Sequence, residues 1–242
     1  MNKPKFGVVA SVTESDPAKF AGALVIAGLK APSVEVRLDG LEDEVGRFWP
    51  FLSNWPKSTP LILTLRSVEQ GGSRVIPLEM QWLLWASLPP EPQSLVADPK
   101  SLIFLDWGLD LIQYCQKNRK RQLFPWEKIG ASLHYFRETP DDLATPVAAL
   151  EAAPALAFLK FVTTATRDTD ADRVKRLFSG RSDPRPFIAF LMGKLGEDSR
   201  RKCLGWGSDA TYGYVPGCPR TAPGQIPFTD LLEDPDVRAA LV

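Results

Sequence analysis

Short apolar segments alternate along the chain with longer segments in which apolar residues recur at helical spacing. A short apolar run bounded by turn residues is typical of a buried strand, whereas the longer recurrence indicates an amphipathic helix. The pattern predicts eight strands, the last one weaker than the others: residues 6–12, 34–39, 61–66, 102–106, 128–134, 156–162, 187–192 and 211–215.

Helices are expected between these strands. Residues 16–29 open with Asp-Pro and residues 139–153 open with Thr-Pro, and a polar residue followed by proline is a helix-start signal. Another helical segment carries Trp82 and Trp85, whose spacing indicates packing in the core rather than a binding site. The Pro-rich residues 88–99 are expected to form a single loop.

Strands that alternate with helices form parallel β/α units. Eight units of about 30 residues each suit a closed barrel. The chain of 242 residues is therefore predicted to be a single α/β domain, residues 1–242, with the (β/α)8 TIM barrel fold. An open, doubly wound sheet is the alternative, but VTESDP follows the first strand where a dinucleotide-binding fold has a Gly-rich phosphate loop.

The composition argues against several classes of function. There are 29 basic and 29 acidic residues, and this balance argues against nucleic acid or an anionic membrane surface as the main partner. No apolar stretch is long enough to span a bilayer, and the apolar run near the start is too short for a signal sequence. Three widely spaced cysteines, Cys115, Cys203 and Cys218, with one histidine indicate reduced thiols in a cytoplasmic compartment rather than a zinc site.

Charged residues on the second predicted strand are expected to face the barrel axis. Side chains of a strand point alternately to its two faces. Val34, Val36 and Leu38 share one face, which should pack against helices, and this directs Glu35 and Arg37 inward.

Charged residues also lie at or near the ends of the next four strands: Arg66, Asp106, His134 and Lys160. The carboxyl-terminal ends of barrel strands are where active sites form. Any one of these residues could simply be a charge that emerges into a loop. Five consecutive strands with such residues favour a shared polar pocket in which opposite charges pair.

Lys160 interrupts an apolar strand, and a buried ammonium is costly unless it is compensated. Two interpretations remain open. Lys160 could pair with Glu35 or Asp106 inside the barrel, or apolar walls and nearby cations could make it a nucleophile that forms an imine with a carbonyl. His134, the only histidine, is either structural or the proton carrier of the site, since no other side chain titrates near neutral pH without a shift.

Six motifs, in order along nearly the whole chain, resemble the type I 3-dehydroquinate dehydratases, the Schiff-base class of the shikimate pathway. One such motif would be a weak signal, but six at matching intervals are specific. The motifs are VEVRLDGLED, PLILTLRSVEQGG, IGASLHYFRETP, FLKFVTTATRDTDADRVKRL, MGKLGEDSR with WGSDATYGY, and TAPGQIP.

The resemblance implies a (β/α)8 barrel, a homodimer without metal or cofactor, and dehydration of 3-dehydroquinate to 3-dehydroshikimate. It implies that Lys160 attacks the ring ketone and forms an imine. His134 would then remove a proton as general base and return it to the departing hydroxyl as general acid. Asp106 would hold His134 in its orientation.

The resemblance also implies a set of substrate-binding residues. Arg200 would hold the substrate carboxylate through two hydrogen bonds. Thr221 and Gln225 would close over the substrate from the loop after the eighth strand. The substrate hydroxyls would be bound by Glu35, Arg37, Arg66 and Gln70.

Four positions depart from the family pattern. Gln70 stands where the family usually has glutamate, Tyr135 where aspartate is common, Gly108 where an acidic residue is expected, and Thr221 where serine is usual. These changes bear on rate and substrate fit more than on reaction type. Two rival functions remain: another lysine-dependent barrel lyase or aldolase, and a non-catalytic relative that binds a metabolite.

Overall fold

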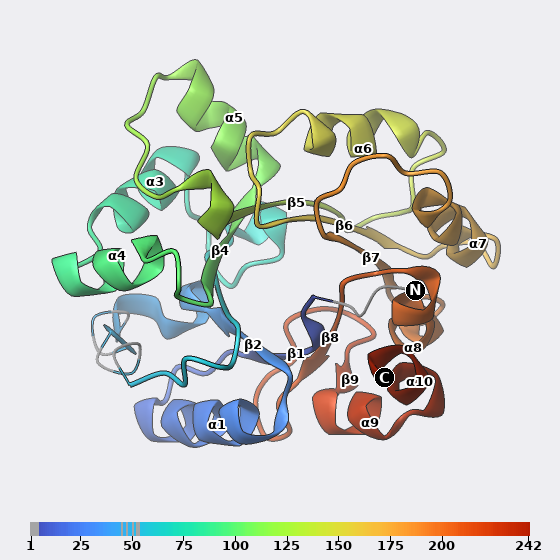
Figure 1. The fold of residues 1–242 in the computed structure, drawn as a ribbon, viewed down its shortest axis with the longest axis horizontal. Helices are drawn as coiled ribbons and strands as arrows, with labels where there is room; N and C mark the ends of the chain where they lie inside the picture. The colour runs from blue at the N-terminus through green and yellow to red at the C-terminus, as the bar shows by residue number, and fades with distance from the viewer. Residues whose placement is uncertain (1–4, 45, 47, 50, 52–53) are drawn as a thin grey trace.

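Parallel strands surround a common axis in the computed structural model, which describes residues 5–44, 46, 48–49, 51 and 54–242. Figure 1 shows the strands around the centre and the helices outside them. The predicted (β/α)8 TIM barrel is confirmed. The described strands are β1 Gly7–Val12, β2 Ser33–Arg37, β3 Leu61–Thr64, β4 Ile103–Gly108, β5 Ile129–Tyr135, β6 Phe158–Thr164, β7 Phe187–Met192, β8 Ala210–Tyr214 and β9 Ile226–Pro227.

The helices cover the outside of this sheet and alternate with the strands along the chain. No helix in the described part of the chain is long and apolar enough to cross a membrane. The α-helices are α1 Pro17–Lys30, α3 Leu78–Ala86, α4 Pro90–Ala97, α5 Leu109–Lys117, α6 Ala144–Glu151, α7 Asp170–Lys175, α8 Glu197–Trp206, α9 Phe228–Glu233 and α10 Pro235–Leu241. The 3-10 helices are η1 Leu38–Glu44, η2 Val68–Gln70, η3 Trp126–Lys128 and η4 Arg176–Phe178.

The strand order is β7-β6-β5-β4-β3-β2-β1-β8-β9, with every pair parallel. Strands β7 and β8 face each other across a seam that has no regular ladder in the described residues. Hydrogen bonds join the seam near its amino end: Asp209 N donates to Phe187 O at 2.9 Å, and Phe187 N donates to Asp209 Oδ2 at 2.8 Å. Asp209 therefore helps to close the barrel.

Two of the expected segments differ from the structure. The helix expected over residues 139–153 begins only at Ala144, because Asp142 Oδ1 accepts hydrogen bonds from the amides of Ala144 and Thr145 at 2.9 and 3.2 Å. Thr139 is buried, and its hydroxyl lies 2.8 Å from that of Thr163. The Thr-Pro start was therefore wrong, whereas the Asp-Pro start of α1 is confirmed by two amide bonds to Asp16.

The expected loop over residues 88–99 was also wrong, because residues Pro90–Ala97 form helix α4. Proline is accepted in the first turn of a helix, where its missing N–H has no intrahelical partner to lose. Of the two tryptophans expected in the core, Trp85 is buried, whereas Trp82 is only partly buried beneath the Lys120 ammonium, 4.7 Å from its ring centroid.

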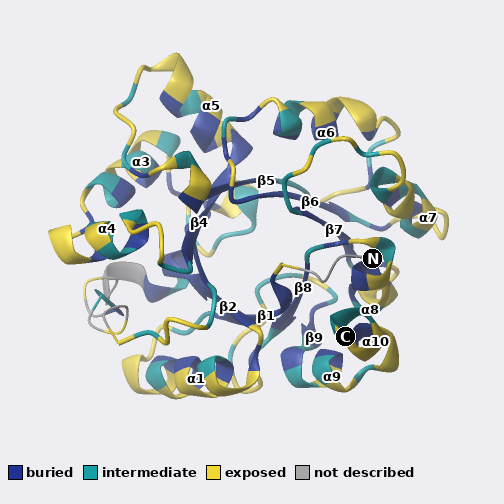
Figure 2. Cartoon of the chain, viewed as in Figure 1, coloured by how far each residue is buried: buried dark blue, intermediate teal, exposed yellow. Residues whose placement is uncertain are grey.

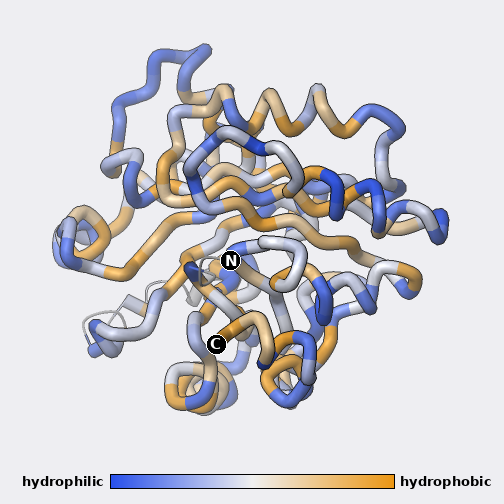
Figure 3. The backbone as a smooth tube through the Cα atoms, turned by 45° about the vertical axis from the view of Figure 1, so that its right-hand side comes forward, coloured by the Kyte–Doolittle hydropathy of each residue, from blue (hydrophilic) through white to orange (hydrophobic). Residues whose placement is uncertain are grey.

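The apolar core has two parts, one between strands and helices and one inside the barrel. Figure 2 shows the strands buried and the outer helix faces exposed, and in Figure 3 the hydrophobic colour follows the strands. As predicted, Val34 and Val36 belong to the outer part while Glu35 lines the interior cavity. The inner part includes Phe158, and Gly130 leaves room for it, since a Cβ there would lie 2.2 Å from the phenyl ring. Apolar packing therefore fills the amino-terminal end of the barrel and leaves the polar residues at the other end.

Candidate active site

A cavity lies inside the barrel at the carboxyl-terminal ends of the strands, with about 440 Å³ of space not filled by atoms, part of it open to solvent. Nine of the ten predicted site residues line this cavity: Glu35, Arg37, Arg66, Gln70, His134, Lys160, Arg200, Thr221 and Gln225. The tenth, Asp106, is fully buried.

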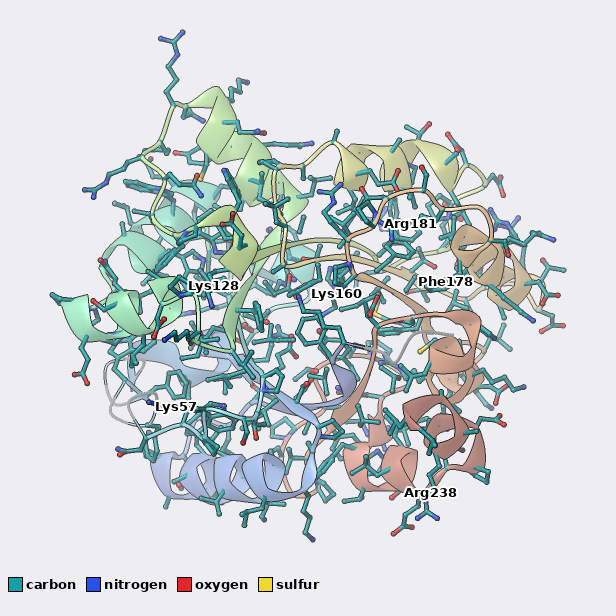
Figure 4. The ribbon with its side chains drawn as sticks, viewed as in Figure 1. Lys57, Lys128, Lys160, Phe178, Arg181 and Arg238 are labelled. Atoms are coloured by element: carbon teal, nitrogen blue, oxygen red, sulfur yellow. The ribbon has the colours of Figure 1, made fainter. Side chains whose placement is uncertain are left out.

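Lys160 extends from β6 into the interior of the barrel, near the centre of the view in Figure 4. Its Nζ lies 3.2 Å from Asp106 Oδ2 and 3.8 Å from Glu35 Oε1. The expected interior ion pair is therefore present, and the side chain also lines the cavity. The two interpretations of Lys160 are compatible, because the same nitrogen can be paired at rest and become a nucleophile once it loses a proton.

Asp106 carries a negative charge in the middle of this cluster. Burial by itself would raise the pKa of Asp106, but the positive charges of Arg66 and Lys160 outweigh burial and hold it below its ordinary value. Arg66 Nη2 lies 2.6 Å from Asp106 Oδ1. Asp106 was expected to hold His134 in its orientation. Among the described residues no hydrogen bond joins the two, and Asp106 contacts Lys160 and Arg66.

His134 lies at the carboxyl-terminal end of β5 with its ring stacked on Phe136, the centroids 5.8 Å apart and the planes 12° apart. Burial lowers the pKa of His134 well below its ordinary value, and the charges of Arg66 and Lys160 lower it further. The imidazole is consequently neutral near pH 7, with a nitrogen free to accept a proton.

Arg200, from α8, is a buried cation without a carboxylate partner among the described residues. Its Nη1 donates to Tyr212 O at 3.2 Å, its guanidinium lies 4.6 Å from the Phe190 ring centroid, and its Nε and Nη2 have no partner in the described structure. Burial lowers the pKa of Arg200 to about 10, so it is still charged at neutral pH. A buried guanidinium with unused donors is suited to hold an anion.

Glu35 and Arg37 from β2 are both held by neighbouring groups. Glu35 accepts hydrogen bonds from the hydroxyls of Ser11 and Thr64 at 2.7 and 2.9 Å, which direct its carboxylate toward Lys160. Arg37 forms two bonds with Asp39, at 3.0 and 2.9 Å. Burial would lower the pKa of Arg37, but the charges of Asp39 and Glu35 raise it overall.

Gln70 and Gly108, two of the departures from the family pattern, are neighbours in space. Gln70 Nε2 donates to the two carboxylate oxygens of Asp110 at 2.7 and 2.6 Å, and its Oε1 accepts from Ser67 N at 2.9 Å. A Cβ at position 108 would lie 2.3 Å from Asp110 Oδ1 and 2.8 Å from Gln70 Nε2. Glycine at 108 therefore makes room for the contact between Gln70 and Asp110.

Tyr135, a third departure, does not line the cavity. Its ring packs edge-on against Phe161 in the outer part of the core, with centroids 5.9 Å apart. This substitution therefore does not change the wall of the site.

Thr221 and Gln225 form one side of the mouth of the cavity. The amide and hydroxyl of Thr221 both donate to Gln225 Oε1, at 2.8 and 3.1 Å. The loop packs closely on the loop after β7: Gly193 N donates to Pro223 O at 3.2 Å, and a Cβ on Gly224 would lie 2.4 Å from Gly193 O. The predicted lid residues are thus part of a docked loop.

Sequence patterns assigned no role to several cavity residues. Tyr212 and Phe136 place aromatic rings beside Lys160 and His134, and strand alternation was the signal that could have placed Tyr212 inside the barrel. Within the described residues, no group of three His, Cys, Asp or Glu side chains could hold a metal ion. The lining residues not predicted are Ser11, Thr64, Gly71, Phe136, Val162, Phe190, Met192, Tyr212 and Ala222.

Comparisons with known proteins agree on one family. The family model described as type I 3-dehydroquinase matches residues 8–234. A 3-dehydroquinate dehydratase from Thermococcus gammatolerans is 29% identical over 228 residues, which cover 93% of this chain and 95% of that protein. One from Thermococcus onnurineus is 31% identical over 210 residues, which cover 84% and 85%. A solved type I 3-dehydroquinate dehydratase from Clostridium difficile, with covalently modified comenic acid, matches with a TM-score of 0.74 at 20% identity, covering 99% of this chain and 92% of that one.

Proposed function

Because the chain belongs to the type I 3-dehydroquinase family, we propose that it dehydrates 3-dehydroquinate to 3-dehydroshikimate through an imine on Lys160. One observation carries the proposal: a lysine and an unpaired, buried arginine, Arg200, line the same small cavity. The lysine can react with a ketone and the arginine can hold a carboxylate. 3-Dehydroquinate carries both groups on one ring.

Imine formation is the first step. The ammonium of Lys160 passes a proton to a neighbouring base, for which the neutral imidazole of His134 is suited. The nitrogen then adds to the ketone carbon. One of its own protons and the proton held by His134 pass to the ketone oxygen, which leaves as water, so that His134 is neutral again. The product is a C=N bond with a positive charge on nitrogen, which draws electrons from the adjacent carbon and makes its proton acidic.

His134 then moves the proton that the dehydration requires. It accepts the proton from the carbon next to the imine, and the electron pair of that C–H bond enters the ring. The ring electrons expel the hydroxyl group, which takes the proton from His134 and leaves as water. Hydrolysis of the conjugated imine releases the enone product and restores the amine of Lys160.

The charged neighbours support these steps. Asp106 holds Lys160 and Arg66 in place, and its charge favours the protonated form of His134 during the transfer. Arg200 holds the substrate carboxylate. Arg66 has a buried Nη1 without a partner in the described residues, which can donate to a substrate oxygen.

The remaining polar residues shape the mouth of the site. In our proposal Glu35 accepts from a substrate hydroxyl, and Gln70, Thr221 and Gln225 contact the substrate from the two loops. Arg37 contributes by holding the loop after β3, since its Nη2 donates to Gly71 O at 2.8 Å.

A homodimer and a cytoplasmic location are part of the same proposal. All three cysteines are free thiols, which supports a reducing compartment. Sedimentation equilibrium of the purified chain tests the dimer: a mass near twice 26.8 kDa is expected, and a monomer at all concentrations would contradict it.

Reduction with borohydride in the presence of 3-dehydroquinate tests the reaction. We expect a substrate-sized mass increase on the peptide that contains Lys160, together with the ultraviolet absorbance of a conjugated enone carboxylate. Lys160→Met should form neither. An adduct with other keto acids but no enone product would favour the aldolase, and binding without any adduct would favour the non-catalytic relative.

A further inference from the structure

We infer that the aromatic ring of Tyr212 is a catalytic group that stabilises positive charge on Lys160 Nζ, and this inference rests on the proposed function. Tyr212 lies in β8, is 3% exposed and lines the cavity. Lys160 Nζ lies 3.9 Å from its ring centroid. The face of an aromatic ring attracts a cation at this distance. The ring therefore contacts the nitrogen that bonds to the substrate.

The ring contributes more to the stability of the protonated imine than to that of the resting ammonium. An ammonium has three N–H groups, and one of them bonds to Asp106 at 3.2 Å. The protonated imine has a single N–H, so its bonds to carboxylates are fewer and more restricted in direction. Attraction to a ring face needs no N–H, so it persists when the nitrogen becomes bonded to the substrate. A contact that is stronger in the protonated imine than in the resting enzyme lowers the barrier, whereas a contact of equal strength in both states does not.

The surroundings of Tyr212 hold the ring in this position. Its ring packs beside that of Phe190, with centroids 5.8 Å apart, and its backbone carbonyl accepts the hydrogen bond from Arg200 Nη1. Tyr212 consequently contacts both the lysine and the arginine of the proposed site. This arrangement fixes the distance between the imine nitrogen and the group that holds the carboxylate.

The hydroxyl of Tyr212 has a separate and smaller part. Its oxygen is buried and has no hydrogen-bond partner in the described residues. Burial raises the pKa of Tyr212 well above its ordinary value, and the charges of Glu35 and Asp106 raise it further, so the hydroxyl stays protonated and is not a base. Removing an unpaired hydroxyl leaves no other group without a partner. The phenylalanine variant therefore isolates the ring.

The experiment compares Tyr212→Phe and Tyr212→Leu with the wild type. For each protein, kcat and KM are measured with 3-dehydroquinate, and the adduct on Lys160 is quantified after borohydride reduction at saturating substrate. We expect Tyr212→Leu to lower kcat by about 30-fold, the size of a desolvated cation–ring contact, and to reduce the trapped adduct. Tyr212→Phe should stay within about threefold of the wild type.

Phe190→Leu is the matched control, because it removes a neighbouring ring that faces Arg200 rather than Lys160. Phe190→Leu should raise KM more than it lowers kcat, whereas Tyr212→Leu should lower kcat more than it raises KM. If Tyr212 had a purely structural role, both variants would change KM and kcat in the same proportion. Thermal melts check that both variants are folded.

The outcomes separate this inference from the proposed function. If the wild type forms no adduct, the proposed function fails and the role of Tyr212 fails with it. If the wild type forms the adduct and Tyr212→Leu matches it in kcat and trapping, only the role of the ring is overturned. If Tyr212→Phe is as impaired as Tyr212→Leu, the hydroxyl and not the ring is the active group, and the inference is wrong.

Discussion

Two buried cations at the same cavity differ in their partners. Lys160 lies within 4 Å of two carboxylates, whereas the partners of the Arg200 guanidinium among the described residues are a carbonyl and a ring face. A paired lysine is stable until it reacts, and an unpaired arginine is most stable when an anion arrives. The neutral His134 completes the set, since it can accept a proton that neither cation can.

The pH dependence of the reaction should report His134. Burial and the charges of Arg66 and Lys160 lower its pKa, so it stays neutral where an ordinary histidine, with a pKa of about 6.5, becomes charged. We expect kcat/KM to keep its plateau through that range and to fall only at lower pH, when the imidazole becomes protonated. His134→Ala should lose about 10²–10⁴-fold in kcat and still form the imine, because water in the open cavity can take the Lys160 proton, whereas the later C–H proton has no base. An acid limb at the ordinary value in the wild type would contradict this assignment.

Replacing Arg200 should weaken binding without loss of stability. Hydrogen bonds to a charged group contribute about 1.5–3 kcal/mol, so Arg200→Met should raise KM roughly 10–150-fold. Because the free protein buries this charge unpaired, the melting temperature should stay the same or rise. Arg201→Met is the control: Arg201 bonds Asp234 at 2.9 Å, away from the cavity lining, and its loss should leave KM unchanged. A lower melting temperature with normal KM would refute the role of Arg200.

Two of the four departures from the family pattern, Gln70 and Thr221, lie outside the strands, whereas Gly108 and Tyr135 are the last residues of β4 and β5. The loop after β3 is tied to α5 through Gln70 and Asp110, to β2 through Arg37, and to the ring of Phe136 through the close approach of Gly71. At Gln70 an amide is required, because its partner is a carboxylate. The substitution of glutamate by glutamine at this position thus matches the local contact.

Gln70→Glu should loosen this loop at neutral pH. The new carboxylate would face Asp110 and repel it, so we expect a melting temperature lower by about 2–4 °C and a higher KM. Adding Asp110→Asn to Gln70→Glu exchanges the donor and acceptor and should restore both values. Calorimetry and steady-state kinetics of the single and double variants measure this coupling. If Gln70→Glu alone is as stable as the wild type, the contact is unimportant.

The whole barrel depends on the seam between its seventh and eighth strands. Asp209 connects three parts of the chain there: its carboxylate accepts from Phe187 N and Lys5 N at 2.8 and 3.0 Å, and its carbonyl accepts from Phe6 N at 2.9 Å. The bond from Phe187 N crosses the seam, where Asp209 N also donates to Phe187 O at 2.9 Å, and the other two tie the segment before β1 to β8. The closure of the barrel is therefore concentrated in a few residues.

Asp209→Ala should destabilise the protein by about 1–3 kcal/mol, because it leaves the amide of Phe187 without a partner. Urea unfolding followed by circular dichroism measures the change. Asp230→Ala, on the exposed side of α9, should change stability by less than about 0.5 kcal/mol. Equal stability of the two variants would mean that the seam is closed by other contacts.

Residue order alone was sufficient for the eight barrel strands and for their inner and outer faces, but it did not predict the two-residue strand β9. The barrel strands and their faces follow from local hydrophobic periodicity, so Glu35 and Lys160 could be placed inside the barrel before any coordinates. Local signals were less reliable at helix starts. Thr139 was attributed to a helix, but its hydroxyl is hydrogen-bonded to that of Thr163, a residue distant in the chain. Proline misled in the other direction at Pro90, where it begins a helix.

Only the tertiary structure decided the partners. The ion pairs of Asp106 with Arg66 and Lys160, the isolation of Arg200, and the ring of Tyr212 beside Lys160 all join strands and helices far apart in sequence. Such contacts depend on strand register and on closure of the sheet, which decide which side chains meet. Periodicity along the chain carries no information at that scale, because it reports which face a residue occupies and not which atom it meets there.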